Sequence, residues 1–306
     1  MAAPTHEEDT TMNLEQMYQQ YREEGYVLIP NALSPQDVAE LQAVTDRVTA
    51  QARGLTEDNA IFDFESGHTP EAPLVQRIKK PHRVDPLYLA MATHPAIFKL
   101  VQRICGDNVR LNHSKMNMKA ARAGSPLEWH QDWAFAPHTN MDTCVASVMI
   151  DDVSTENGAM HVLPGSHLGP LLEHHDPEFG FVGAVDVLAQ GVDVAKAASL
   201  TGAAGTVSIH HPMTMHGSGA NHSGRQRRIL FLEYAASDAY PLFYNVEWDE
   251  YDSRLLSGPS TSHVRCEPNV IKLPYPSRAG SSIYKAQALA RERQFDKTVI
   301  EKVMQA

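Results

Sequence analysis

The stretch EWHQDWAF, residues 128–135, places a histidine and an aspartate two positions apart, His130 and Asp132, among aromatic residues. If this stretch ends a strand, the two side chains project to the same face and could reach one ion. A third ligand must come from elsewhere, and the candidate is His216, where a strand-like stretch ends before the turn-rich GSGANHSG. Two histidines and one carboxylate form a facial triad that leaves one side of an octahedral metal open, as non-haem iron(II) oxygenases require. Zinc hydrolases could use the same atoms.

An arginine distinguishes an iron(II) oxygenase from a zinc hydrolase. Arg227 lies eleven positions beyond His216, and a hairpin through the glycine-rich stretch would bring it beside the metal on the neighbouring strand. Its planar fork of donors could pair bidentately with the far carboxylate of a dicarboxylic co-substrate whose other end chelates the iron. Ser218 could add a hydroxyl. Arg225 and Arg228 are the alternatives: alternation puts Arg225 on the same face and Arg228 on the opposite one, and the spacing favours Arg227.

Four other histidines form adjacent pairs, His174 with His175 and His210 with His211. The members of such a pair point to opposite faces of a strand, so neither pair chelates a metal easily. We expect these histidines at the surface or as hydrogen-bonded core residues.

Two features bear on a substrate pocket. Trp129, Trp133 and Phe135 are typical core residues, and among them Trp133 is the candidate to wall the pocket. Residues 237–281 are aromatic and turn-rich, which fits a lid over the pocket or a surface for a partner. The sequence leaves both options open.

Helical patterns dominate the first third of the chain. Residues 13–24 are helical and Gly25 stops them, and a short apolar run, YVLIP, then predicts a strand. A second helix opens with Ser34 as N-cap and Pro35 at its first position. Residues 54–75 are irregular and predict a loop, and residues 85–106 predict two short helices broken at Pro95.

Short strands dominate the next part of the chain. Alternating or apolar stretches bounded by turn residues lie at 109–121, 144–153, 205–215 and 227–236, and a last helix is predicted at 281–305. Helices followed by strands indicate an α+β chain in which helices buttress a β-sandwich.

Composition narrows the class of partner. The chain has 306 residues, 42% of them hydrophobic, and a net charge of −11, which argues against binding nucleic acid or an anionic membrane. It contains no apolar run long enough to span a membrane, and its N-terminus lacks the pattern of a secretory signal. Its three cysteines, Cys105, Cys144 and Cys266, are widely spaced. We therefore expect a cytoplasmic protein with reduced thiols.

Four strings, EEGYVLIPNALSPQDVAEL, WHQDWAF, ENGAMHVLPGSH and HGSGANHSGRQRR, occur in this order over roughly residues 15–235. Together they resemble the phytanoyl-CoA dioxygenase (PhyH) family of Fe(II)/2-oxoglutarate-dependent oxygenases. The resemblance implies a double-stranded β-helix, a cupin-like jelly roll with iron in its mouth. It further implies that Fe(II), 2-oxoglutarate and O2 take part in the reaction.

The resemblance also implies roles for individual residues. His130, Asp132 and His216 would bind iron, and Arg227 with Ser218 would anchor 2-oxoglutarate. Two further co-substrate contacts are implied: Lys119 matches a basic position of relatives, and Arg77, in VQRIKK, falls near another contact.

The aspartate also bears on the reaction. Asp132 stands where halogenating relatives carry glycine or alanine, so hydroxylation is favoured over halogenation. The expected substrate is a small organic molecule, such as an amino acid derivative or a secondary metabolite, and no coenzyme A signature is present. A cupin-like metalloenzyme without 2-oxoglutarate, or a non-catalytic metal- and ligand-binding sensor, are the alternatives.

The expected organisation is a flexible N-terminus at 1–12 and a single oxygenase domain at 13–306. Within this domain, helical support spans about 13–106, the jelly-roll core about 107–236, and a lid with the C-terminal helix 237–306. Neither a monomer nor a homo-oligomer is favoured by the sequence.

Overall fold

The computed structural model describes residues 12–243, 245–273 and 282–288. Residues 1–11 of the expected N-terminal segment and most of the helix expected at 281–305 lie outside the described residues. Within the described part of the chain, no helix is long and apolar enough to cross a membrane.

The larger of the two main sheets is antiparallel and has eight strands. The strands follow the order β1-β11-β6-β13-β4-β3-β2, and β14 also pairs with β4. Their bounds are β1 Tyr26–Ile29, β2 Phe62–Phe64, β3 Val75–Lys79, β4 Val109–Lys119, β6 Thr143–Met149, β11 Val207–His210, β13 Arg227–Ala236 and β14 Leu255–Ser257.

The strands expected at 109–121, 144–153, 205–215 and 227–236 are confirmed as β4, β6, β11 and β13. The loop expected at 54–75 is wrong in part, because it contains β2. The backbone amides of that strand pair with β3, a long-range partner that the local sequence does not reveal. The large sheet therefore takes strands from outside 107–236.

The smaller sheet is also antiparallel and has the order β10-β7-β12-β5. Its strands are β5 Leu127–His130, β7 Met160–Val162, β10 Ala198–Leu200 and β12 His216–Ser218, and a separate ribbon joins β8 His175–Asp176 to β9 Gly180–Phe181. Short helical turns lie at η1 Pro81–Arg83, η2 Asp132–Ala134, η3 Ser166–Leu168 and η4 Val194–Lys196.

The helices begin and end where capping chemistry predicts. α1, Leu14–Glu24, starts with a capping box at Asn13 and ends at Gly25, whose φ of 81° is left-handed. α2, Pro35–Ala50, starts at Ser34 with proline in its first turn. The remaining helices are α3 Pro86–Met91, α4 Pro95–Cys105, α5 Trp248–Asp252 and α6 Ile283–Gln287. The two helices predicted on either side of Pro95 are confirmed as α3 and α4.

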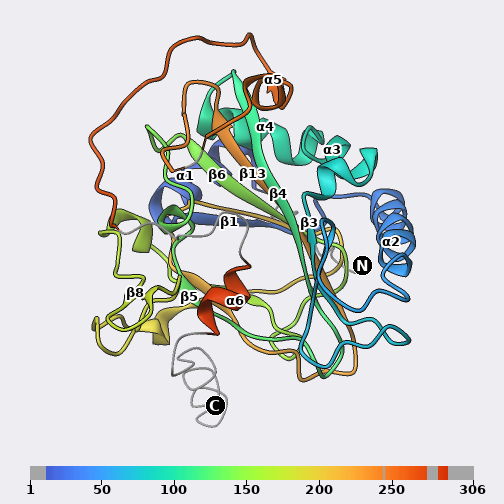
Figure 1. Cartoon of the computed structure of the whole chain (residues 1–306). Coiled ribbons are helices and arrows are strands. Elements are labelled where there is room, and N and C mark those ends of the chain that lie inside the picture. The colour runs from blue at the N-terminus through green and yellow to red at the C-terminus, as the bar shows by residue number, and fades with distance from the viewer. Residues whose placement is uncertain (1–11, 244, 274–281, 289–306) are drawn as a thin grey trace, which may run out of the picture.

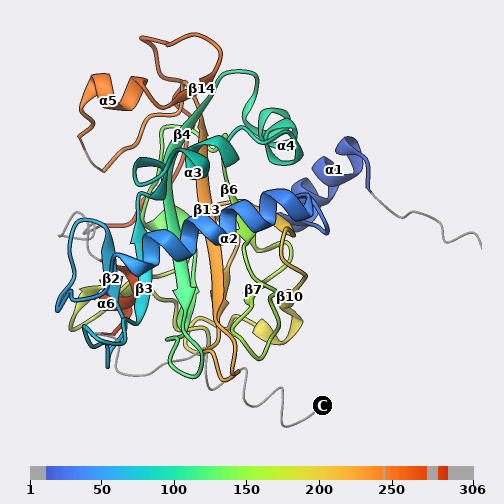
Figure 2. The ribbon, with the colours of Figure 1, turned by 90° about the vertical axis from the view of Figure 1, so that its right-hand side faces the viewer.

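The large sheet is covered on both faces. Figure 2 shows α2 crossing one face of the sheet, with α3 and α4 on the same side. On that face Ile209 and Leu232 pack in the helix-facing core. On the other face Ile229 and Phe231 pack with Val162 of the small sheet. Strand alternation thus separates a helix-to-sheet core from a sheet-to-sheet core, and the chain is α+β with helices against a sandwich of antiparallel sheets.

Candidate active site

A metal-binding geometry forms where β5, the edge strand of the small sheet, pairs with β12. His130, the last residue of β5, is the register partner of His216, the first residue of β12, and their rings are 4.1 Å apart. Asp132 follows in η2, and its carboxylate oxygens lie 3.8 Å from Nε2 of His130 and 3.7 Å from Nε2 of His216. One ligand atom from each residue lies within 4.8 Å of the others. The predicted triad thus converges, although the strand ends at His130 and a turn carries Asp132.

Backbone carbonyls orient both histidine rings. Nδ1 of His130 is 2.7 Å from the Glu128 carbonyl, and Nδ1 of His216 is 2.9 Å from the Thr214 carbonyl. A carbonyl only accepts, so each Nδ1 carries the proton and each Nε2 presents a lone pair toward Asp132. Burial holds the pKa of His130 well below its usual range and lowers the pKa of His216 to about 4. Both rings are therefore neutral near pH 7, as metal ligands must be.

Asp132 keeps its charge despite burial. Burial raises its pKa, but the charge of Lys115 and the hydrogen bond from His210 are among the interactions that outweigh burial and hold the pKa well below its usual range. Nε2 of His210, in β11 of the large sheet, lies 3.2 Å from Oδ2 of Asp132. The result is a charged carboxylate between two neutral imidazoles, a donor set suited to iron(II) or zinc.

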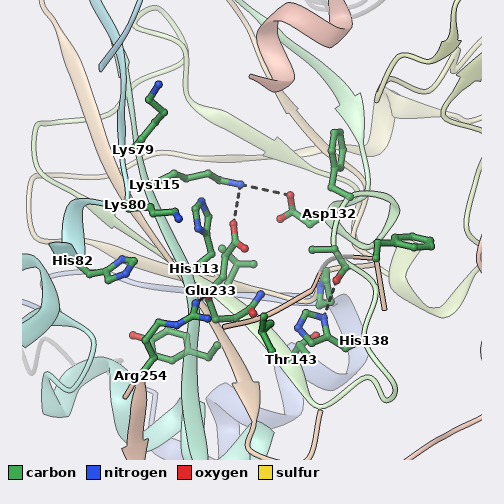
Figure 3. A pocket seen from close by; sticks show the side chains of 18 of the residues that line it. Lys79, Lys80, His82, His113, Lys115, Asp132, His138, Thr143, Glu233 and Arg254 are labelled. Atoms are coloured by element: carbon green, nitrogen blue, oxygen red, sulfur yellow. Dashed lines mark hydrogen bonds and ion pairs between the residues drawn. The ribbon is translucent and has the colours of Figure 1, made fainter. Parts of the chain in front are cut away.

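A partly buried ion pair lies beside this carboxylate. Nζ of Lys115 is 3.1 Å from Glu233 and 3.8 Å from Asp132, as the dashed lines in Figure 3 mark. Lys115 in β4 and Glu233 in β13 come from adjacent strands of the large sheet. Burial lowers the pKa of Lys115, but the two carboxylates outweigh it, so the pKa is raised and the ammonium is retained.

A cavity of about 570 Å³ opens onto the triad at Asp132. Its volume falls within the range of small-molecule sites, roughly 300–1,000 Å³. Its walls include several charged and polar side chains, among them Lys80, His82, His113 and Arg254, which Figure 3 labels. Residues of the predicted lid segment 237–281, among them Val246 and Glu250, also line the cavity.

Some buried polar atoms of the cavity wall have no hydrogen-bond partner within the described structure, among them Nε2 of His82, Nε2 of His138 and Oγ1 of Thr143. Nδ1 of His138 is 2.8 Å from the Ala136 carbonyl, so it carries the proton and Nε2 can only accept. Burial lowers the pKa of His138 to about 4, which leaves the ring neutral. Such atoms offer hydrogen bonds to a polar substrate.

Arg227 lies at the start of β13 and is 2% exposed. Its guanidinium donates to the Gly158 carbonyl, at 3.1 Å from Nε and 2.5 Å from Nη2, and no carboxylate of the described residues forms an ion pair with it. Burial lowers its pKa to about 10, so the group remains charged. A buried cation without a carboxylate partner is costly, and an anionic ligand would compensate it.

The position of Arg227 depends on a glycine in the ENGAMH string. Gly158 has φ of +86°, and a Cβ at this residue would lie 2.7 Å from the Gly219 carbonyl and 2.8 Å from Cδ of Lys119. Only glycine fits this turn without strain. Its carbonyl can therefore approach the buried guanidinium.

Lys119 and Ser218 lie next to Arg227. Lys119 is the register partner of Arg227 on β4, and its Nζ donates to Oγ of Ser218 at 2.8 Å and to the Gly219 carbonyl. The structure therefore brings three of the four predicted co-substrate residues together.

The fourth predicted co-substrate residue, Arg77, lines the cavity on β3, and its Nη2 forms an ion pair with Asp63 at 2.6 Å. Trp133 is 1% exposed and packs in the interior. In the cavity wall, the aromatic residue from this stretch is Phe135. Trp133 is therefore a core residue and not a wall of this cavity.

The two alternative arginines have other surroundings. Arg228 forms ion pairs with Asp46 at 2.5 Å and Asp151 at 2.7 Å, and Arg225 is exposed. Arg227 is therefore the arginine of this triplet that is buried without an ion-pair partner in the described residues.

Two of the paired histidines do more than the sequence suggested. His210 contacts Asp132, and Nε2 of His174 accepts from the backbone amide of Gln131, between two members of the triad, at 2.9 Å. Alternation in a strand does indicate that one of His210 and His211 faces inward. Nothing in the local sequence indicates which residue of the triad the inward-facing histidine contacts.

Comparisons with known proteins identify the family of this chain. The sequence profile of the family described as phytanoyl-CoA dioxygenase (PhyH) matches residues 21–229. The probable alpha-ketoglutarate-dependent hypophosphite dioxygenase of Stutzerimonas stutzeri is 35% identical over 280 residues, which cover 90% of this chain and 98% of that protein. The L-proline trans-4-hydroxylase of Streptomyces griseoviridis is 27% identical and covers 70% of this chain and 83% of its own.

A solved structure supports the fold. The apo form of EctD from S. alaskensis matches with a TM-score of 0.64 and 22% identity over 85% of this chain and 90% of that one. The family profile covers more than half of the chain and includes all three members of the triad. The chain belongs to the phytanoyl-CoA dioxygenase (PhyH) family of Fe(II)- and 2-oxoglutarate-dependent dioxygenases.

Proposed function

We propose that His130, Asp132 and His216 bind the catalytic Fe(II). The observation that carries this assignment is the convergence of two neutral Nε2 lone pairs with one charged carboxylate, all within 4.8 Å. Two backbone carbonyls fix the ring orientations, so the donor set is already arranged for a metal. Three protein ligands leave positions for a bidentate co-substrate and for O2.

The distal carboxylate of 2-oxoglutarate is assigned to Arg227, with Ser218 and Lys119 beside it and Arg77 further along the sheet. The support is a buried guanidinium whose charge has no ion-pair partner among the described residues. A bidentate pair with a carboxylate would supply that partner.

The bound iron and 2-oxoglutarate supply the oxidising chemistry, in which O2 is consumed, succinate and CO2 are released and the substrate is oxidised. The reaction proposed here is hydroxylation of a C–H bond in a small organic molecule. The cavity would hold the substrate beside Asp132. His138 Nε2 and Thr143 Oγ1 can receive a polar N–H or O–H group of that substrate.

Hypophosphite oxidation is a second candidate. The hypophosphite dioxygenase relative matches over nearly all of its length, well beyond the region of the family profile. The cations Lys80 and Arg254 in the cavity wall would suit an anionic substrate. The cavity volume of about 570 Å³, however, is far larger than the volume of a hypophosphite ion, and this favours a larger substrate.

Three broader inferences accompany this function. The facing sheets correspond to the halves of a double-stranded β-helix centred on residues 107–236. Residues 13–306 form one oxygenase domain with helical support and a lid. The enzyme works in the cytoplasm, without nucleic acid or membrane partners, as its acidic composition suggests.

An anaerobic titration tests the metal and co-substrate assignments. Fe(II) and 2-oxoglutarate are added to metal-free protein, and the visible charge-transfer band is measured in wild type, Asp132→Ala, Arg227→Ala and the exposed control Arg225→Ala. We expect a band in wild type, a much weaker one in Asp132→Ala, and at least tenfold more 2-oxoglutarate for half-saturation in Arg227→Ala. Arg225→Ala should behave as wild type.

Iron binding without a band in wild type would contradict the 2-oxoglutarate assignment. Substrates can then be sought by release of succinate in air, with hypophosphite and small amino acid derivatives compared directly. If hypophosphite does not increase succinate release, hypophosphite oxidation is excluded as the second candidate function.

A further inference from the structure

Gln131 lies between two members of the triad, just beyond the end of a strand pair. The pairing of β5 with β12 ends at His130 and His216, and η2 begins at Asp132. The strand ladder therefore does not hold the turn that carries the carboxylate. Gln131 is fully buried, and both polar atoms of its side chain form hydrogen bonds with other segments. Such a side chain can hold the turn where the ladder does not.

The side chain of Gln131 connects this turn to the segment that precedes β12. Its Nε2 donates to the Met213 carbonyl at 3.0 Å. The backbone amide of Trp133 donates to the neighbouring Pro212 carbonyl, also at 3.0 Å. The two residues that flank Asp132 are thus bonded to adjacent carbonyls. These hydrogen bonds limit how far the segments that carry the metal ligands can move apart.

Gln131 also binds the loop of residues 163–174, which leads into β8. Nε2 donates to the Pro170 carbonyl at 3.2 Å, and Oε1 accepts from the backbone amide of Leu172 at 2.8 Å. The backbone amide of Gln131 donates to Nε2 of His174 at 2.9 Å, and Figure 1 shows β8 beside β5. The metal-ligand turn is therefore joined to two other segments through one residue.

The ring of His174 is itself held in one orientation. Its Nδ1 is 2.9 Å from the Leu172 carbonyl, so Nδ1 carries the proton and Nε2 accepts. The ring stacks on Phe181, with centroids 6.5 Å apart and planes at 11°, and meets the ring of Phe135 edge to face. The acceptor for the backbone amide of Gln131 is therefore fixed in place.

We propose that Gln131 is a positioning residue of the metal site, whose side chain holds Asp132 at the right place relative to His216. This inference rests on the proposed function, in which the triad binds Fe(II). Without the side-chain amide, the turn would keep its Trp133 hydrogen bond but lose the link to Met213. Ligands that are no longer arranged in advance bind a metal more weakly, because binding must then order them.

The test measures metal binding by wild type, Gln131→Met and the matched control Gln190→Met. Methionine is about as long as glutamine but cannot donate these hydrogen bonds. Gln190 also bonds to loop backbone, but its two side-chain hydrogen bonds both go to Glu173. The metal-free proteins are titrated with Fe(II) without oxygen. We expect Gln131→Met to bind Fe(II) roughly 10- to 100-fold more weakly and Gln190→Met to equal wild type.

A spectroscopic measurement separates positioning from a general loss of stability. Co(II) replaces Fe(II), because its visible absorption bands report the geometry of the ligands. At saturating Co(II), we expect the bands of Gln131→Met to differ from those of wild type, whereas Gln190→Met matches wild type. Unchanged Fe(II) affinity in Gln131→Met would overturn the proposal. Weaker binding with an unchanged Co(II) spectrum would also overturn it, because the side chain would then affect stability alone.

His174→Phe decides the question if Gln131→Met does not fold. This change removes the acceptor of the Gln131 backbone amide and keeps an aromatic ring against Phe135 and Phe181. We expect Fe(II) affinity to fall roughly tenfold, with a changed Co(II) spectrum. Affinity and spectrum equal to those of wild type would then overturn the proposal.

The failure of this inference differs from that of the proposed function. If wild type binds neither Fe(II) nor Co(II), the metal site itself is wrong. If wild type binds both metals and the Gln131 and His174 variants bind them equally well with the same spectrum, the proposed function stands and Gln131 has no positioning role.

Discussion

Nε2 of His210 lies 3.2 Å from Oδ2 of Asp132, and this contact joins the two main sheets at the metal site. His210 ends β11 of the large sheet, whereas Asp132 follows β5 of the small sheet. The histidine is fully buried. It can hold one carboxylate oxygen by a hydrogen bond and leave the other free for a metal.

Replacing His210 by phenylalanine keeps a ring of similar size and removes this contact. We expect Fe(II) affinity to fall roughly 10- to 100-fold, as is usual when the partner of a metal ligand is lost. Iron binding to the metal-free protein measures the effect, with the exposed His222→Asn as control. Unchanged affinity in His210→Phe would show that Asp132 needs no such support.

Removing one partner of the Lys115–Glu233 ion pair should destabilise the protein, because the other charge would be left without a partner. The side chains are 19% and 16% exposed, so Lys115→Met leaves a nearly buried carboxylate unpaired. We expect a loss of about 3 kcal/mol in the free energy of unfolding. Lys115→Met/Glu233→Gln should recover much of this loss.

Urea denaturation of the metal-free proteins measures these changes. Lys196→Met, at an exposed pair with Asp193, should have little effect. A double variant whose loss equals the sum of the two single losses would mean that the pair is not coupled.

Buried neutral histidines predict loss of stability in mild acid. Burial lowers the pKa values of His113, His138 and His174 from 6.5 to about 4. Between pH 6.5 and 4 the unfolded chain therefore binds protons that the folded protein excludes, and the free energy of unfolding falls as pH falls. The contribution of these groups is fully present above pH 6.5.

Urea denaturation of metal-free protein at pH 7, 6 and 5 tests this expectation. His138→Asn retains an N–H for the Ala136 carbonyl and removes the titrating ring, so its stability should depend less on pH. Carboxylates with lowered pKa, such as Glu173 at about 2, act mainly below this window. Stability that is constant or rises between pH 7 and 5 would contradict the prediction.

The sequence predicted the triad because each member stands within a short string. His130 and Asp132 are two residues apart, and His216 precedes a glycine-rich turn. Arg227 was found from its spacing, and the burial of its guanidinium agrees with that choice. Trp133 was assigned to the pocket from its residue type alone, and the backbone turn at η2 directs Phe135 to the cavity instead.

The supporting residues could not be found in this way. Three supporting residues come from other elements. His210 lies on β11, Glu233 on β13 and Gln287 on α6. Each depends on strand register or helix docking, which are set by packing between distant parts of the chain. No local pattern records them.

Caps, turns and alternation are local properties, so the sequence by itself determined α1 and α2, the main strands, the α+β class and the candidate metal-ligand residues. The tertiary structure alone decided that β2 joins the large sheet, that His210 contacts Asp132 and that Gln287 of α6 hydrogen-bonds to β5. These features arise from hydrogen bonds and burial between residues far apart in the chain, whose free energy depends on the whole fold.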